Sequence, residues 1–307
     1  MKVISITSLL LFALSVTPSI SSHQATNSFL MSYAGQGVND ILTQACATTF
    51  EIKGQEPSAP GKYPVFVYTV GTGESINDNG AAEAAIAGMA SRGFVAAAVQ
   101  YDTKDFATCG VISGKAKCIY DSASQTSAIT KLCSRSAADC SKGIVVGGFS
   151  QGSVIAILAK NFDSRVIAAW GIGACVQYAT FNLSLCLAPD KRKLASDRLR
   201  VVNGEKDIFV GSPLPNATIN LPITPPINLP DNGRIQARAL TGFQCNTSNN
   251  CLQSNGSGWY LVLDTEITGG GAEHCYWRKS RNNINQCDGA RDELNAQWQT
   301  DDKAPWA

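Results

Sequence analysis

Apolar residues in this chain gather into short runs, and longer stretches with the composition of helices separate these runs. The runs predicted as strands are 63–70, 94–102, 143–149, 165–173, 199–207 and 258–271. The stretches predicted as helices are 78–93, 120–133 and 150–162. Most runs are apolar throughout rather than alternating, as in strands that helices cover on both faces. From residue 63 onward the pattern therefore predicts an α/β fold with a mainly parallel central sheet and helices on both faces.

Residues 211–233 depart from this alternation. They contain six prolines and have no pattern of a helix or a strand. Because a predicted strand lies beyond them, we expect an inserted loop within one domain, residues 23–307, rather than a linker between two domains. Two interpretations of this loop stay open: a lid over a site and a passive surface loop.

Residues 1–22 have the pattern of a secretory signal peptide. Lys2 supplies a positive charge, an apolar run extends from Val3 to Val16, and Pro18 and small serines follow it. The run is shorter than the roughly 20 residues that a membrane-spanning helix needs. The sequence therefore predicts a secreted, extracellular protein without stable membrane insertion. In a eukaryotic secretory pathway it would also be a glycoprotein, with sequons that begin at Asn182, Asn216, Asn246 and Asn255.

Charge and cysteine content narrow the classes of partner and cofactor. The formal net charge is only +1 and the two signs are mixed along the chain, which argues against a nucleic-acid partner. Eleven cysteines follow the signal region, no CxxC pattern occurs and only two histidines are present, so disulfides are favoured over metal binding. Local spacing leaves Cys46 unpaired but does not fix the connectivity. The expected pairs are Cys109–Cys118, Cys133–Cys140, Cys175–Cys186, Cys245–Cys251 and Cys275–Cys287.

The stretch "GIVVGGFSQGSVIAILAK", residues 143–160, contains a G-x-S-x-G pattern around Ser150. The pattern alone is weak, and its context strengthens it: a predicted strand ends directly before the serine and a predicted helix begins directly after it. Such a tight, strained turn lifts the serine hydroxyl out of the sheet, and the flanking glycines let two backbones pass closely. Ser150 is therefore the predicted nucleophile.

A serine hydroxyl is a poor nucleophile at neutral pH unless a histidine takes its proton and a carboxylate orients that histidine. Only His23 and His274 exist, and His23 lies at the predicted cleavage region. His274, in a glycine-rich loop after the last predicted strand, is therefore the expected base. Glu205 and Asp207 follow an earlier strand at its carboxyl end, where α/β sheets build their sites. Asp207 is the preferred acid, with Glu205 as the alternative.

Acyl transfer at a serine also requires backbone N–H groups that stabilise a developing oxyanion. One donor is expected from Gln151, directly after the nucleophile, and a second from the turn after an early strand, residues 70–75. Within this turn Thr72 is the preferred donor, and Gly71 and Gly73 are alternatives. A plain glycine-rich turn without this role is the competing interpretation.

With these residues identified, the chain resembles the α/β-hydrolase superfamily between about residues 63 and 277. The resemblance rests on the GFSQG pentapeptide, on the G-x-x-D that ends at Asp207, and on the late His274. The closest likeness is to secreted esterases and lipases, including dienelactone-hydrolase-like and polyester-hydrolase-like branches, and the pentapeptide is similar to the GYSQG of cutinases. Two features depart from these patterns. Asp207 and His274 lie 67 positions apart, whereas cutinases keep them close, and Val70 precedes Gly71 where a histidine is usual.

The resemblance implies a disulfide-stabilised α/β-hydrolase fold and a serine hydrolase that cleaves carboxylic esters through an acyl-enzyme. Ser150 would attack, His274 would carry the proton, and Asp207 would orient the imidazole. Thr72 and Gln151 would hold the oxyanion, with no metal or organic cofactor. The implied partner is a small-molecule or polymeric ester, and the protein is expected to be a monomer. The alternatives are a serine peptidase or amidase on the same fold and a catalytically silent binding or effector protein.

Overall fold

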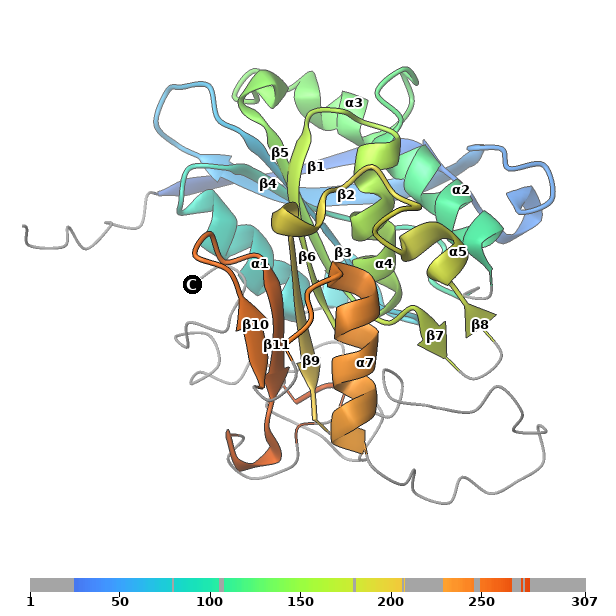
Figure 1. Cartoon of the computed structure of the whole chain (residues 1–307). Coiled ribbons are helices and arrows are strands. Elements are labelled where there is room, and N and C mark those ends of the chain that lie inside the picture. The colour runs from blue at the N-terminus through green and yellow to red at the C-terminus, as the bar shows by residue number, and fades with distance from the viewer. Residues whose placement is uncertain are drawn as a thin grey trace, which may run out of the picture.

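The computed structural model describes residues 25–78, 80–104, 108–178, 181–205, 207, 229–245, 249–266, 272 and 274–276. Its centre is a nine-stranded sheet with the order β1-β2-β4-β3-β5-β6-β9-β11-β10 (Figure 1). The strands, in chain order, are β1 (Thr26–Gly35), β2 (Thr48–Pro57), β3 (Val65–Thr69), β4 (Val95–Val99), β5 (Ile144–Phe149), β6 (Val166–Ile172), β9 (Leu199–Gly204), β10 (Asn250–Leu252) and β11 (Gly258–Val262). A separate two-stranded sheet joins β7 (Gln177–Tyr178) to β8 (Phe181–Asn182).

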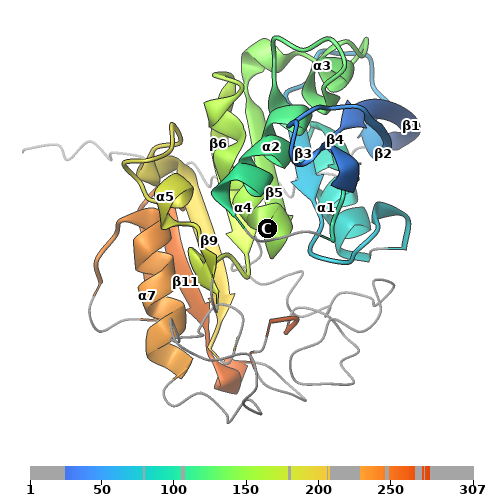
Figure 2. The ribbon, with the colours of Figure 1, turned by 90° about the vertical axis from the view of Figure 1, so that its right-hand side faces the viewer.

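The six middle strands, from β4 to β11, are parallel to their neighbours, and antiparallel pairs occur only toward the two edges of the described sheet. Helix α1 lies on one face of the sheet, and α2, α4 and α7 lie on the other (Figures 1 and 2). The predicted mainly parallel α/β sheet with helices on both faces is confirmed. The described α-helices are α1 (Gly80–Ala90), α2 (Cys109–Tyr120), α3 (Ala128–Cys133), α4 (Gln151–Leu158), α5 (Ser184–Leu187) and α7 (Leu229–Thr241).

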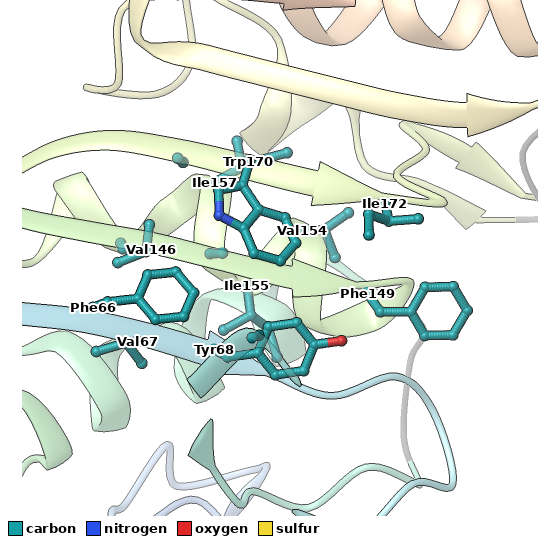
Figure 3. Packing of buried hydrophobic residues seen from close by; sticks show 14 of the residues in the cluster. Phe66, Val67, Tyr68, Val146, Phe149, Val154, Ile155, Ile157, Trp170 and Ile172 are labelled. Atoms are coloured by element: carbon teal, nitrogen blue, oxygen red, sulfur yellow. The ribbon is translucent and has the colours of Figure 1, made fainter. Parts of the chain in front are cut away.

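One part of the core lies between β3, β5, β6 and α4 (Figure 3). All eight residues of α4 are buried, as expected for a helix that is apolar on every side. The Trp170 indole packs against Phe66 and Tyr68, with ring centroids 6.1 and 5.7 Å away. Burying an aliphatic or aromatic side chain here stabilises the fold by about 1.5–3 kcal/mol. The nucleophile turn is therefore built on a rigid support.

Some elements differ from the prediction. In the stretch 120–133, α2 ends at Tyr120 and the next helix begins only at Ala128, because the Asp121 carboxylate accepts the Ala123 N–H at 3.0 Å and holds a turn instead. The run 258–271 is a strand only to Val262, and residues 267–271 lie outside the described part of the chain. The hairpin β1–β2 and helix α2 were not predicted, because the polar and apolar residues of these segments do not form runs.

Helix α7 begins inside the stretch predicted to be an inserted loop. Its residues 229–233 are helical, and residues 211–228 lie outside the described part of the chain. Pro230 is compatible with this helix because it stands in the first turn, where a backbone N–H has no helical acceptor. Residues 229–233 are therefore helical rather than part of a loop, and the inserted loop stays a prediction for the residues before them.

The disulfides correct part of the expected pairing. Cys133–Cys140 and Cys245–Cys251 form as predicted, whereas Cys109 and Cys118 stand on the same helix, about 13 Å apart at 1.5 Å per residue, too far for one bond. Cys175 is a buried free thiol, so it rather than Cys46 is the unpaired cysteine of the described residues. Cys275 is disulfide-bonded, and its expected partner Cys287 lies outside the described residues. The long-range bonds that replace the expected ones are Cys46–Cys118 and Cys109–Cys186.

The predicted signal peptide, residues 1–22, lies outside the described residues, as does His23. Within the described residues, no helix combines the length and the apolar character needed to cross a membrane.

Candidate active site

Ser150 occupies a sharp turn between β5 and α4. Its φ of 51° and ψ of −120° place it in a strained region, and Gln44 is the only other described non-glycine residue with positive φ. The Ser150 N–H donates to Ile172 O at 2.8 Å, and its carbonyl accepts from the Ser153 hydroxyl at 2.6 Å. The backbone of the predicted nucleophile is therefore fixed from the adjacent strand and from the first turn of α4.

The glycines on either side of Ser150 are required by backbone contacts. A Cβ on Gly152 would lie 2.1 Å from Thr69 O and 2.4 Å from Val70 O. A Cβ on Gly148 would lie 2.5 Å from the carbonyl carbon of Gly152. Because these neighbours are main-chain atoms, they have little freedom to move. The G-x-S-x-G pattern thus allows helix α4 to pack directly on the end of β3.

The turn after β3 carries the predicted oxyanion donors. The Gly71 N–H donates to the Glu74 carboxylate at 2.7 Å, and the Gly73 N–H donates to Thr103 O at 3.1 Å. Both alternative donors are thus already used within the protein. The Thr72 N–H has no acceptor among the described residues, and Thr72 itself is exposed. On the other side of Ser150, Gln151 opens α4, where the first amides have no helical acceptor. The turn therefore favours Thr72 over Gly71 and Gly73.

The two candidate acids after β9 have different surroundings. Glu205 is half-buried, and its carboxylate accepts the Asp264 N–H at 2.6 Å, which ties β9 to the segment after β11. Asp207 is 2% exposed, and its Oδ2 lies 2.6 Å from Nδ1 of His274. Glu205 therefore supports the backbone, and Asp207 is the carboxylate that meets the predicted base.

His274 is held by contacts on two sides besides Asp207. It is 5% exposed, and its ring lies over the ring of Phe149, with a centroid distance of 4.7 Å and an interplanar angle of 40°. The Cα of Gly173 packs against it as well, since a Cβ built there would lie 2.7 Å from Cε1. Gly173 follows Ile172, the residue that accepts the Ser150 N–H. The fold thus gathers His274 and Asp207 beside the nucleophile turn, at the carboxyl edge of the sheet.

Residues 173–176, which follow β6, were not predicted to belong to the site, yet their backbone is hydrogen-bonded to β9 and α7 at the carboxyl edge of the sheet. The buried Asn203 amide spans the Ala174 backbone, accepting its N–H at 3.0 Å and donating to its carbonyl at 3.2 Å. Gln236 of α7 accepts the Val176 N–H at 2.9 Å. Burial raises the pKa of the Cys175 thiol to about 12, and the negative charge of Asp207 adds to this shift. No sequence pattern marks Ala174 and Val176, because their hydrogen-bond partners stand on β9 and α7, far away in the sequence.

The aromatic residues near the site divide into two groups. Phe149 and Tyr276 are each 1% exposed, so they pack within the protein rather than line an open surface. The ring of Phe149 lies at the end of β5, beyond the rest of the cluster (Figure 3). Trp277 lies outside the described residues. Among the described residues, no three histidine, cysteine, aspartate or glutamate side chains gather in a way that could hold a metal ion.

Comparisons with known proteins add little. No protein-family model and no curated protein matches the chain. Among similar solved structures, brefeldin A esterase, described as a bacterial homologue of human hormone-sensitive lipase, has 12% identity and a TM-score of 0.46, covering 88% of this chain and 73% of its own. A hypothetical protein from Pseudomonas aeruginosa has 14% identity and a TM-score of 0.36. That match covers 53% of this chain and 46% of the other, so this chain spans less than half of that protein's length. Neither TM-score reaches 0.5, and function is therefore inferred from the site geometry.

Proposed function

We propose that this chain is a secreted serine hydrolase that cleaves carboxylic esters. Ser150 is the nucleophile, His274 the general base and acid, and Asp207 the carboxylate that orients the imidazole. The backbone amides of Thr72 and Gln151 stabilise the oxyanion. The substrate is a small-molecule or polymeric ester, and the protein acts as a monomer without a metal or organic cofactor.

One observation carries this proposal: the buried 2.6 Å contact between His274 Nδ1 and Asp207 Oδ2. The two residues are 67 positions apart, and they meet beside a strained serine at the carboxyl edge of the sheet. A carboxylate at Nδ1 fixes the tautomer that leaves Nε2 free to take a proton from serine. A histidine serving only as packing would not need a buried ionisable partner.

The geometry supports a two-step reaction. In the first step the Ser150 Oγ–H bond breaks, Oγ bonds to the ester carbonyl carbon, and His274 Nε2 accepts the proton. The oxyanion collapses, the alcohol leaves with the proton from His274, and an acyl-enzyme remains. Water then attacks the acyl group with His274 again as base, releasing the acid and restoring Ser150. The N-terminus of α4 adds a favourable field at the oxyanion.

Disulfides support the secreted part of the proposal. Four are described, and such bonds persist mainly in oxidising compartments. Of the four sequons, those at Asn182 and Asn255 stand on exposed residues, and those at Asn216 and Asn246 lie outside the described part of the chain. The domain proposed for residues 23–307 contains all described elements of the sheet.

The first test is hydrolysis of p-nitrophenyl esters from acetate to palmitate by the native protein and by Ser150→Ala. We expect kcat to fall by about 10⁴-fold or more in the variant, because removing the attacking serine of a triad has an effect of this size. A fluorophosphonate probe, followed by mass spectrometry, should place its adduct on Ser150. The matched control is Ser164→Ala, an exposed serine in the turn before β6, which should hydrolyse esters like the native protein.

Three outcomes are informative. Ester hydrolysis that disappears only in Ser150→Ala supports the proposal, and the chain-length profile separates an esterase from a lipase. If no ester is hydrolysed but the probe labels Ser150, a peptidase or amidase is favoured. A panel of anilide substrates then tests that alternative. Equal activity in both proteins, or no labelling at all, would overturn the assignment of Ser150.

A further inference from the structure

The turn that follows β3, residues 70–74, is held in place by the segment after β4. Tyr101 donates its hydroxyl to Val70 O at 2.6 Å. Thr103 contacts the turn twice, since its carbonyl accepts the Gly73 N–H at 3.1 Å and its hydroxyl donates to Glu74 O at 3.3 Å. These bonds fix both ends of the turn, and the remaining question is what fixes its middle.

A carboxylate from the turn itself does so. Glu74 folds back across three residues, so that Oε2 accepts the Gly71 N–H at 2.7 Å, while its own N–H donates to Gly71 O at 3.3 Å. The two bonds close a ring around Thr72 and Gly73. The carboxylate lies close to the residue before the nucleophile, because a Cβ on Gly71 would meet both Glu74 Oε2, at 3.2 Å, and Phe149 Cδ1, at 2.8 Å.

Glu74 is only 8% exposed, and burying a carboxylate is costly unless strong hydrogen bonds compensate it. A neutral or shorter side chain would avoid this cost in a turn with no further purpose. The negative charge also acts on its surroundings: burial, and then the charge of Glu74, raise the pKa of Tyr101 well above its usual value. The Tyr101 hydroxyl therefore keeps its proton and remains a donor to Val70 O.

We infer that Glu74 is a positioning residue for the oxyanion site, an assignment that rests on the proposed function. By engaging the Gly71 amide, its carboxylate leaves the Thr72 amide as the donor in this turn and fixes the direction in which that N–H points. An acceptor of the right reach holds the Gly71 amide in place, which suits a neighbouring donor that must be positioned within about 0.5 Å. Glu74 touches neither substrate nor the reacting atoms in this role.

The test separates the reach of the side chain from its charge. Glu74→Gln keeps an acceptor at the same reach, whereas Glu74→Asp keeps the charge and, one methylene shorter, does not reach the Gly71 amide. Each is assayed with the best p-nitrophenyl ester of the panel and with its thiono analogue, in which sulfur replaces the carbonyl oxygen. A well-placed oxyanion donor prefers oxygen, so the oxo-to-thiono ratio of kcat/KM measures its placement.

We expect kcat for the oxo ester to fall about 10- to 100-fold in Glu74→Asp, less than the 10²–10³-fold typical of losing an oxyanion donor outright. KM should change less than about threefold, and the oxo-to-thiono ratio should fall at least fivefold, since the loss is confined to the transition state. Glu74→Gln should stay within about fivefold of the native kcat and keep the native ratio. The control is Glu83→Asp, an exposed glutamate paired with Lys53, which should match the native protein.

A native oxo-to-thiono ratio in Glu74→Asp would overturn the inference, as would an equal loss in both Glu74 variants, because reach would then not be the deciding property. If Glu74→Asp does not fold, folded Glu74→Met, which keeps the length of the side chain and removes the acceptor for the Gly71 N–H, takes its place: a native ratio would overturn the inference and a reduced ratio would support it. Failure of the proposed function is distinguishable, since Ser150→Ala would then keep its activity whatever the Glu74 variants do.

Discussion

The two halves of the candidate site are held by different kinds of contact. The nucleophile half, residues 70–74 and 148–152, is fixed mainly by backbone contacts, which are glycines packed on main-chain atoms and a strained serine, and one side-chain carboxylate closes its turn. The acid–base half, Asp207 and residues 274–276, is fixed by side chains, chiefly one carboxylate–imidazole contact and a ring packed on Phe149. The geometry of the nucleophile half depends on residues that are close in the sequence. The geometry of the acid–base half depends on the topology, which brings distant residues together.

This difference predicts how each half fails. Backbone contacts cannot be relieved by a rotamer change, so substitutions of the glycines in the nucleophile half should reduce the stability of the whole core. When a side-chain contact is removed, the backbone around it can stay in place. Substitutions in the acid–base half should therefore reduce the rate of hydrolysis and leave the fold nearly intact.

The largest effect is expected at Asp207. In Asp207→Asn the amide no longer selects the tautomer with a proton on Nδ1, so kcat/KM for the best ester should fall by about 10⁴-fold. The melting temperature should change little. Glu205→Gln is the matched control, since its carboxylate supports the Asp264 backbone and should affect the rate less than about tenfold. A larger rate loss in Glu205→Gln than in Asp207→Asn would reverse the assignment of the acid.

Gly152→Ala tests the nucleophile half through stability. A Cβ there would lie 2.1 Å from Thr69 O, and main-chain overlap of this kind should cost about 3 kcal/mol. That corresponds to a fall in melting temperature of about 5 °C for a domain of this size, measurable by circular dichroism. Gly110→Ala is the control, because its nearest neighbour is a side-chain oxygen 3.7 Å away and alanine favours helix α2. A native melting temperature in Gly152→Ala would contradict the close approach of α4 to β3.

Gly173→Ala tests the acid–base half at a backbone position. The new methyl group would lie 2.7 Å from His274 Cε1, and the φ of +61° is unfavourable for alanine. Because a ring can move aside, we expect displacement of the imidazole, with kcat/KM lower by about 10- to 100-fold. The melting temperature should fall less than in Gly152→Ala. Native kinetics combined with a lower melting temperature would argue that His274 takes no part in the reaction.

The same contrast explains which parts of the site could be predicted from the sequence. The nucleophile half was predictable, because a strand, Ser150 with its glycines, and a helix follow one another within about 18 residues. His274 was predictable for another reason: only two histidines exist, and one lies at the expected cleavage region. Glu74 and Asn203 were not, because their roles depend on partners that only the folded chain brings near. Asp207 was preferred over Glu205 from the sequence, although both follow the same strand, and the contact of Asp207 with His274 agrees with this preference.

The fold divides in a similar way. Parallel strands buried on both faces appear as apolar runs, and all six predicted runs contain a strand of the sheet. Hairpin β1–β2 has one accessible face and a mixed pattern, so it was not predicted. The disulfides were half predicted: bonds that span 6 or 7 residues follow from spacing, and those that span 72 or 77 follow from helix α2 meeting other segments.

The smallest predicted effect concerns the free thiol beneath the acid–base half. The pKa of Cys175 is raised from its usual value near 9 to about 12, so the folded state holds this proton more tightly than the unfolded state. Stability is therefore complete below about pH 9 and decreases as the pH rises toward 12, by about 1 kcal/mol at pH 10. Urea unfolding at pH 7 and pH 10 should show a larger loss in the native protein than in Cys175→Ala, because buried tyrosines such as Tyr101, whose pKa is also raised, contribute the same loss to both proteins. Equal losses of stability in the two proteins would mean that another group is responsible for the whole pH dependence. Separately, labelling of Cys175 by a thiol reagent in the native state at pH 8 would show that the segment after β6 opens readily, because the thiol is buried.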